Sequence, residues 1–205
     1  MGKRKAFEAA LSSDFRWPKK GDTPFAASPD RDRNTTVESS QFLRPHQIKA
    51  GYLHAANSLV QQTQEHPKKR ETLVFPIIFS YRQYIELSLK YLIDDFGAMV
   101  GVNANWTTHD LARLWHMLEN ILEEYGTSDP DKADQVVRKI IAQFAKVDPQ
   151  SYSYRYPVDT RGQEIPTAIE ELDLEVLADV MKGVESYFNG CQDYLDHLVS
   201  SAQGA

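Results

Sequence analysis

The stretch KRETLVFPIIFSYRQYIELSLKYLIDDF, residues 69–96, decides the fold class of this chain. Its apolar residues recur at steps of three and four, the period of an α-helix, and they cover most of the circumference of that helix. A helix of this kind is buried by other helices on more than one side. Pro76 within it predicts a kink or a late start, and Gly97 predicts its C-terminal end.

Four further segments show the same helical period. A reciprocal capping box of Thr107 with Asp110 opens the second of them, Asp129 with Pro130 opens the third, and Asp173 caps the last. Their predicted ranges are 45–66, 111–125, 130–147 and 174–198. We therefore predict an all-α fold, an antiparallel bundle of about five helices.

Residues 151–165, between the last two helices, have a different pattern. Tyr152, Tyr154 and Tyr156 alternate with polar residues before a turn sequence that ends in Gly162. Such alternation is typical of a short β-hairpin or of an ordered loop. This segment is the one part of the chain for which we expect any β structure.

The first 44 residues differ from the rest in charge. They hold nine basic and six acidic residues, 9 − 6 = +3, whereas residues 45–205 hold 14 and 23, 14 − 23 = −9. Prolines and a lack of aliphatic residues exclude a long helix over 14–45. We predict an N-terminal arm over 1–44, either an extended strap or partly disordered, and a helical domain over 45–205. The aromatic residues that could dock a strap are Phe15, Trp17, Phe25 and Phe42.

Composition excludes several classes of protein. The 205 residues are 41% hydrophobic and 25% charged, as in one globular domain, and the net charge of −6 excludes a wholly basic nucleic-acid-binding surface. Cys191 is the single cysteine, which excludes internal disulfides and indicates a reducing compartment. The longest apolar run, seven residues over 73–79, is far short of the roughly 20 that cross a bilayer. We expect a cytoplasmic protein with no membrane segment, metal site or cofactor.

Two short motifs resemble those of a known superfamily. The core helix carries RQYIELSLKYLI, residues 82–93, and His109-Asp110-Leu111 follows after a gap of 15 residues. This pair resembles the HEPN superfamily, in which a Glu-x-x-Leu-Lys core helix precedes a His-Asp-Leu helix start. The resemblance implies a HEPN-like helical bundle over about 45–200, commonly a homodimer. Its members include ribonucleases of bacterial toxin–antitoxin and antiviral-defence systems, and non-catalytic nucleotide-binding or adaptor proteins.

The ribonuclease motif of the active members is absent from this chain. Those members carry an arginine followed four to six residues later by a histidine, and no arginine here has a histidine at that distance. Arg44 with His46 and Arg113 with His116 are too close together. The resemblance therefore points to the non-catalytic relatives more than to the ribonucleases.

Arg82, Glu86 and Lys90 lie four residues apart on the core helix and form one charged stripe. Charges on a buried helix need partners or a cleft. The stripe is either a self-satisfied ladder that fixes helix packing or a binding site for a ligand such as phosphate.

Two other groups of residues could carry chemistry. His109 stands in the first turn of a helix, where the dipole favours a neutral ring that could act as a base, although it could equally pack beside the cap. The 151–165 segment offers arginines that can bind phosphate and a tyrosine that can stack on a base, or it could simply cover the bundle. Its candidate residues are Arg155, Tyr156, Asp159 and Arg161.

Three functions remain open from the sequence. The first is an interaction or nucleotide-binding module, expected to be a homodimer that works with RNA, a nucleotide or a protein partner in a defence or toxin–antitoxin system. The second is a metal-independent endoribonuclease with catalytic His109 and Arg155, and the third is a structural dimer without a ligand. Residues 163–198, with nine acids and one base, suit solvent or a basic partner better than a nucleic-acid backbone. The predicted ligand-binding residues are Arg82, Glu86, Lys90, Tyr156, Asp159 and Arg161.

Overall fold

The computed structural model describes residues 16–203, and the chain divides into two units, 1–38 and 39–205. The described residues of the first unit form turns and irregular chain around one 3₁₀ turn, η1 (Arg31–Arg33), which the Asp30 side chain caps. Trp17 and Phe25 are both exposed. Phe15, the first of the aromatic residues predicted to dock a strap, lies outside the described residues.

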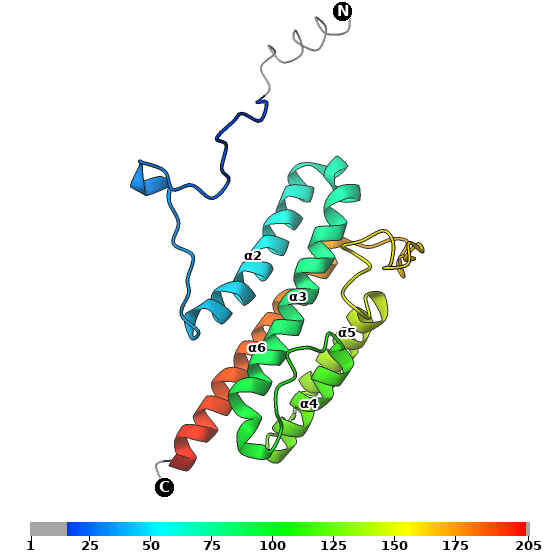
Figure 1. Ribbon diagram of the computed structural model, residues 1–205. Helices are drawn as coiled ribbons and strands as arrows, with labels where there is room; N and C mark the ends of the chain where they lie inside the picture. Colours follow the sequence, from blue (N-terminus) through cyan, green and yellow to red (C-terminus); the bar gives the residue numbers. More distant parts are fainter. Residues whose placement is uncertain (1–15, 204–205) are drawn as a thin grey trace, which may run out of the picture. The chain divides into compact units, whose positions relative to one another are not determined.

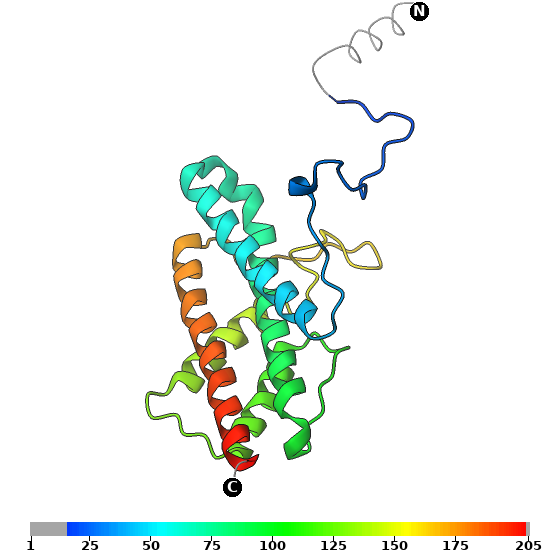
Figure 2. The ribbon, with the colours of Figure 1, turned by 90° about the vertical axis from the view of Figure 1, so that its left-hand side faces the viewer.

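The second unit is a bundle of five α-helices, as the sequence predicts (Figures 1 and 2). Two short 3₁₀ turns, η2 (Pro67–Lys69) and η3 (Ala98–Val100), follow the first and second of these helices. None of the helices in the described part of the chain is long and apolar enough to cross a membrane. The five helices are α2 (Leu43–Glu65), α3 (Arg70–Phe96), α4 (Leu111–Glu124), α5 (Ala133–Val147) and α6 (Leu174–Gln203).

The core helix of the sequence, α3, is central in the bundle. It packs against α2, α4 and α6, and α5 packs against α4 and α6. Burial on more than one side is confirmed, because both Tyr84 and Leu92 are buried beside the main apolar row. Burying each large apolar side chain contributes about 1.5–3 kcal/mol. The residues of that row, all 0% exposed, are Ile77, Tyr81, Ile85, Leu89 and Ile93.

The helices are not all antiparallel to their neighbours. α2 with α3, α4 with α5, and α5 with α6 are antiparallel, but α3, α4 and α6 run in the same direction (Figure 1). The Tyr125 hydroxyl just after α4 donates to the carbonyl of Phe96, the last residue of α3, at 3.3 Å. The antiparallel expectation is wrong for these helices because the loop over residues 97–110 returns the chain to the middle of α3 before α4 begins.

Of the capping signals predicted at the starts of α4 and α6, one is confirmed and one is wrong. Asp173 caps α6, since its Oδ1 accepts from the backbone of Glu175 at 2.8 Å. Asp110 alone caps α4, accepting from the Arg113 amide at 3.1 Å, whereas the Thr107 hydroxyl bonds to Asn105. The predicted reciprocal capping box is therefore wrong.

Two prolines also act differently from the prediction. α3 begins at Arg70 and continues through Pro76, so a late start at that proline is wrong. α5 does not begin at Pro130 but at Ala133, after Lys132 takes a left-handed backbone conformation with φ of 62°. Residues 129–132 form a turn before that helix.

The predicted β-hairpin does not form, and residues 151–165 are an ordered loop. The described chain contains no strand, and here it makes one isolated antiparallel bridge, Val158 with Glu164. The backbone amides of Arg155 and Tyr156 both donate to the carbonyl of Tyr152, which closes a helical turn. The alternating tyrosines therefore follow a turn and cannot form the ladder of a strand.

Candidate functional site

Arg82 is the centre of a buried polar cluster. It lies in the middle of α3, its side chain is 0% exposed, and each of its three guanidinium nitrogens donates a hydrogen bond. Nε donates to the Asp148 carbonyl at 2.9 Å, Nη1 to Glu86 Oε2 at 2.8 Å, and Nη2 to the His109 carbonyl at 2.7 Å. Arg82 thus joins α3 to the C-terminal end of α5 and to the start of α4.

Glu86, one turn further along α3, is the shared anion of the cluster. Its Oε1 accepts from Lys90 Nζ at 2.7 Å and lies 2.9 Å from Nδ1 of His109. Lys90 also donates to the carbonyl of Trp106 at 3.0 Å. Burial alone would raise the pKa of Glu86, but the hydrogen bonds from Lys90 and Arg82 outweigh burial and hold that pKa below its ordinary value.

The charges of the cluster balance one another. Two cations, Arg82 and Lys90, stand against two buried carboxylates, Glu86 and Asp148. The Asp148 carboxylate lies 3.6 Å from Arg82 Nε through Oδ2. The stripe predicted from the sequence is therefore a ladder whose charged groups bind one another and the backbone, and its three members are almost closed to solvent.

His109 and Trp106 project from the loop that this ladder holds. The prediction that His109 stands in the first turn of a helix is wrong, because Asp110 caps α4 and His109 precedes that cap. The His109 side chain is 46% exposed and Trp106 is 44% exposed. The carbonyl groups of the same two residues accept from Arg82 and Lys90, so the buried cations fix the backbone while both rings face solvent. The Glu86 carboxylate also holds the His109 ring in one orientation.

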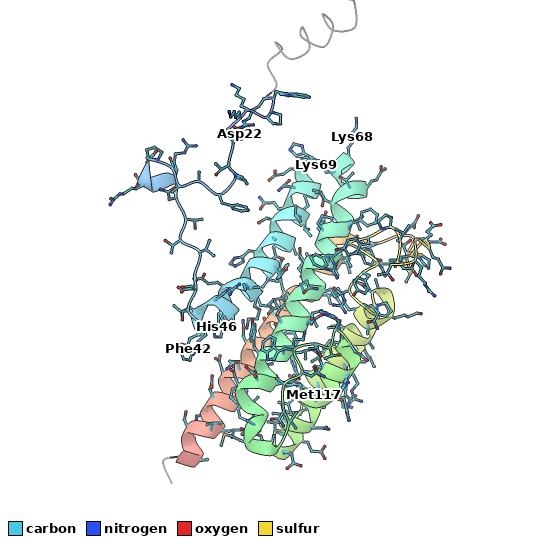
Figure 3. All side chains as sticks on the ribbon, in the orientation of Figure 1. Asp22, Phe42, His46, Lys68, Lys69 and Met117 are labelled. Carbon is cyan, nitrogen blue, oxygen red and sulfur yellow. The ribbon has the colours of Figure 1, made fainter. Side chains whose placement is uncertain are left out.

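The Trp106 ring continues an aromatic row across the bundle. Its centroid lies 5.2 Å from that of Tyr91, and Tyr91 stacks on His46 with 6.3 Å between centroids. Figure 3 shows His46 near the start of α2. Sequence reasoning missed Trp106; the available signal was a single tryptophan in a polar loop three residues before the predicted site histidine.

A second segment, residues 148–156, is held against α3 beside Arg82. Asp148 Oδ1 accepts from the amides of Tyr152 and Ser153 at 2.8 and 3.0 Å. Ser151, which is buried and has φ of 61°, accepts through its hydroxyl from Gln83 Nε2 at 2.8 Å. The sequence does not mark Asp148 as part of the site, because an aspartate that follows a helix and a buried ion-pair partner look alike in one dimension.

Arg155 lies among aromatic rings on this second segment. Its Nε donates to the Ser151 carbonyl at 2.6 Å, and its guanidinium carbon lies 5.2–5.3 Å from the ring centroids of Phe79, Tyr152 and Tyr156. Arg155 itself is exposed, as are the two tyrosines. The arrangement places a cation and aromatic faces on the same patch of surface.

Asp159 and Arg161 form a separate turn. Arg161 Nε lies 3.2 Å from Asp159 Oδ2, and Asp159 Oδ1 accepts from the amides of Arg161 and Gln163. The Gln163 and Arg161 amides lower the pKa of Asp159. No hydrogen bond or ion pair within residues 16–203 joins this turn to the Arg82 cluster.

The loop that carries His109 and the loop that carries Arg155 lie along the same side of α3, and both views show this (Figures 1 and 2). Two surface hollows, of about 1020 and 220 Å³, are lined by other residues, so the predicted site residues do not form the walls of either. Over residues 16–203 no group of three or more histidine, cysteine, aspartate or glutamate residues could hold a metal ion.

Comparison of the chain with protein-family models, with curated proteins and with solved structures found no match. The resemblance to the HEPN superfamily therefore stays a prediction from two sequence motifs. The function has to be argued from the site itself.

Proposed function

We propose that this protein is a nucleotide-binding module that takes a nucleobase on the loop of Trp106 and a phosphate on the loop of Arg155. The observation that carries the proposal is the fixed loop over residues 105–110. Two buried cations hold its backbone carbonyls, and they leave the Trp106 and His109 rings half exposed. A base can stack on an aromatic ring, and a positioned histidine can hydrogen-bond to it.

The Arg155 patch supplies the complementary part of such a site. Its exposed guanidinium can bind a phosphate, and Tyr152 and Tyr156 offer further faces for a base. The buried Arg82, Glu86 and Lys90 act indirectly in this proposal, because they position the two loops without reaching solvent. Preorganised loops lower the entropy lost when a ligand binds.

Single-stranded RNA and a free nucleotide share this chemistry, and a binding experiment distinguishes them. We would titrate the protein into a fluorescein-labelled single-stranded RNA of mixed sequence, follow its anisotropy, and add AMP as a competitor. Displacement of the RNA by AMP identifies the free nucleotide as a sufficient ligand. Binding that AMP does not displace identifies the strand as the ligand.

Matched substitutions locate the site in the same experiment. Trp106→Leu and Arg155→Gln are each expected to weaken binding about tenfold, as for the loss of one stacked base or one phosphate contact. The controls Tyr194→Leu and Arg138→Gln change similarly exposed residues on α6 and α5 and should leave binding unchanged. Equal weakening by test and control variants, or no binding by the unaltered protein, contradicts the proposal.

One observation favours a second candidate, a metal-independent endoribonuclease. A half-exposed histidine oriented by a buried carboxylate, as His109 is by Glu86, is an arrangement used for general acid–base catalysis. RNA cleavage in EDTA that falls about 100-fold in His109→Ala supports this candidate. His116→Ala changes an exposed histidine within α4 and is the matched control. If cleavage is no greater than in a sample without the protein, the endoribonuclease candidate is contradicted and the nucleotide-binding module is favoured.

A further inference from the structure

A groove of about 1020 Å³ lies at the end of the bundle where α3 and α6 begin. The end of α2, the first turns of α3 and the loop over residues 154–173 form its walls together with the start of α6. None of the residues of the proposed nucleotide site lines it. The groove is therefore a second feature of the surface, independent of that site.

The lower walls of the groove are apolar. Ile78 and Leu174 belong to the buried core at its base, while Phe75 and Leu172 are 43% and 38% exposed. The Phe75 ring also contacts that of Tyr154, with 6.2 Å between centroids. The groove thus offers apolar side chains to an occupant, including an aromatic ring that is still partly in water.

The rim of the groove is strongly acidic. Arg70 is its single cationic lining residue, and it already faces Glu175 across 3.9 Å. Lys68 and Lys69 lie at the turn between α2 and α3 but do not line the groove (Figure 3). The carboxylate residues of the lining are Glu71, Glu170, Glu171, Asp173 and Glu175.

Two of these carboxylates neither stabilise a helix start nor form an ion pair among the described residues. Asp173 caps α6, and Glu71 stands in the first turn of α3, where the helix dipole favours an anion. Glu170 and Glu171 are exposed, and neither makes an ion pair with any residue in the described part of the chain. Adjacent unpaired carboxylates repel each other, and a cation placed between them would relieve that repulsion.

We infer that this groove binds a peptide segment of a partner protein in which lysine or arginine residues alternate with apolar ones. The apolar residues would cover Phe75 and Leu172, and the basic residues would pair with the Glu170 and Glu171 carboxylates. The acidic charge of the rim favours this peptide over two other occupants, a nucleic acid and a second copy of the chain. A nucleic-acid backbone would be repelled by the rim, and the helical domain of a second copy, with 14 basic and 23 acidic residues over 45–205, is not complementary to it.

A peptide-binding experiment on the full chain tests this inference. The probe is a fluorescein-labelled synthetic peptide of alternating lysine and leucine, compared with a glutamate and leucine peptide and with a lysine and serine peptide. We expect the first to bind at least about tenfold more tightly than either of the others, because it alone meets both the rim and the apolar walls. Added salt should weaken its binding, because the rim charges are exposed.

Charge-matched variants locate the binding. The double variant Glu170→Gln with Glu171→Gln should weaken the lysine and leucine peptide about tenfold. Glu123→Gln with Glu124→Gln removes the same charge from two adjacent exposed residues at the end of α4 and should leave binding unchanged. Leu172→Ser should weaken binding without changing its salt dependence, whereas Val176→Ser, just outside the groove, should have no effect.

Three outcomes would overturn the inference. If both glutamate double variants weaken peptide binding equally, the peptide is attracted by the overall negative charge of the protein and not by the groove. Equal binding of the three peptides would mean that the groove does not select this chemistry. A change of oligomeric state in the Glu170 and Glu171 variant, seen by light scattering, would assign the groove to a second copy of the chain. Because these variants leave Trp106, His109 and Arg155 unchanged, the result can be told apart from that of the nucleotide proposal.

Discussion

A single arginine joins three helices in this protein. Arg82 donates to an α3 carboxylate, to the carbonyl before α4 and to the carbonyl that ends α5. A planar guanidinium can make these divergent bonds at once, whereas a lysine ammonium at the same place could not. One fully buried side chain therefore contacts the backbone of both proposed binding loops.

Glu86 should make the stability of the protein depend on pH. Its pKa in the folded protein is below the ordinary value of 4.5, so its carboxylate stabilises the fold above that value, and this contribution is lost as the pH falls through the folded pKa. Glu86→Gln leaves Arg82 and Lys90 without their anion and should lower the free energy of unfolding by about 3 kcal/mol or more at neutral pH. The gap between the two proteins should shrink below pH 4.5.

Urea unfolding from pH 7 downward measures this gap. Glu123→Gln, at an exposed position on α4, is the control and should follow the unaltered protein at every pH. A gap between the Glu86→Gln variant and the unaltered protein that stays constant from pH 7 to the acid limit would contradict the role given to the carboxylate.

Tyr154 carries a hydroxyl that the fold does not use. Tyr154 is 7% exposed, and its hydroxyl is one of the buried polar atoms without a hydrogen-bond partner among the described residues. Burial, together with the charge of Asp148, raises its pKa. Removing an unsatisfied buried hydroxyl while keeping the ring is neutral or stabilising. Tyr154→Phe should therefore leave the melting temperature unchanged or raise it, and a loss above about 1 kcal/mol would reveal a bonded hydroxyl.

At the scale of the element, the start of α4 connects the helix to the proposed site. Asp110 caps the helix. In the residue before it, His109, the carbonyl accepts a hydrogen bond from Arg82 and the ring contacts the Glu86 carboxylate. Helix α4 therefore begins where the chain is already held by α3. The helix then carries its own apolar face, with Leu111, Leu114 and Leu118 all buried.

Removing the Asp110 side chain that caps α4 should destabilise both the fold and the loop that precedes the helix. Asp110→Ala should lower the free energy of unfolding by about 1 kcal/mol, the usual loss for an N-cap side chain. Asp131→Ala, near the start of α5, is the control, because its contact with the Ala133 amide is long at 3.4 Å. Thermal unfolding followed by circular dichroism measures both. Equal melting temperatures for Asp110→Ala and the unaltered protein would show that α4 does not need this cap.

At the scale of the whole molecule, the expected homodimer needs an exposed surface on which two copies of the chain can meet. The core helix does not offer that surface, because α2, α4 and α6 of the same chain pack against α3. The start of α2 is one exposed apolar patch, with Phe42, Leu43 and Ile48 between 40% and 74% exposed. Exposed patches of this kind are often subunit contacts.

We predict that light scattering will give twice the chain mass of 23.4 kDa. Ile48→Lys should shift the protein toward the monomer, because a lysine in an apolar interface has no partner for its charge. Val136→Lys changes a similarly exposed aliphatic residue on α5 and should leave the mass unchanged. A monomer mass for the unaltered protein at micromolar concentration would end the dimer prediction.

The helices of this protein could be predicted from the sequence because their signals are local. Period, prolines and capping aspartates lie within a few residues of the elements that they define, so five helices and the cap at Asp173 could be placed in advance. The charged stripe on α3 was visible for the same reason, since its members are one turn apart.

The partners of those residues were decided by the tertiary structure alone. Asp148 lies 66 residues from Arg82, and Ser151 lies 68 residues from Gln83. No local pattern marks such pairs, because the contact exists only after the loop over residues 97–110 returns the chain to the middle of α3. The same return makes α3 and α4 parallel and exposes Trp106 beside His109. A one-dimensional pattern records which residues are buried, but the direction in which the chain comes back depends on packing between distant helices.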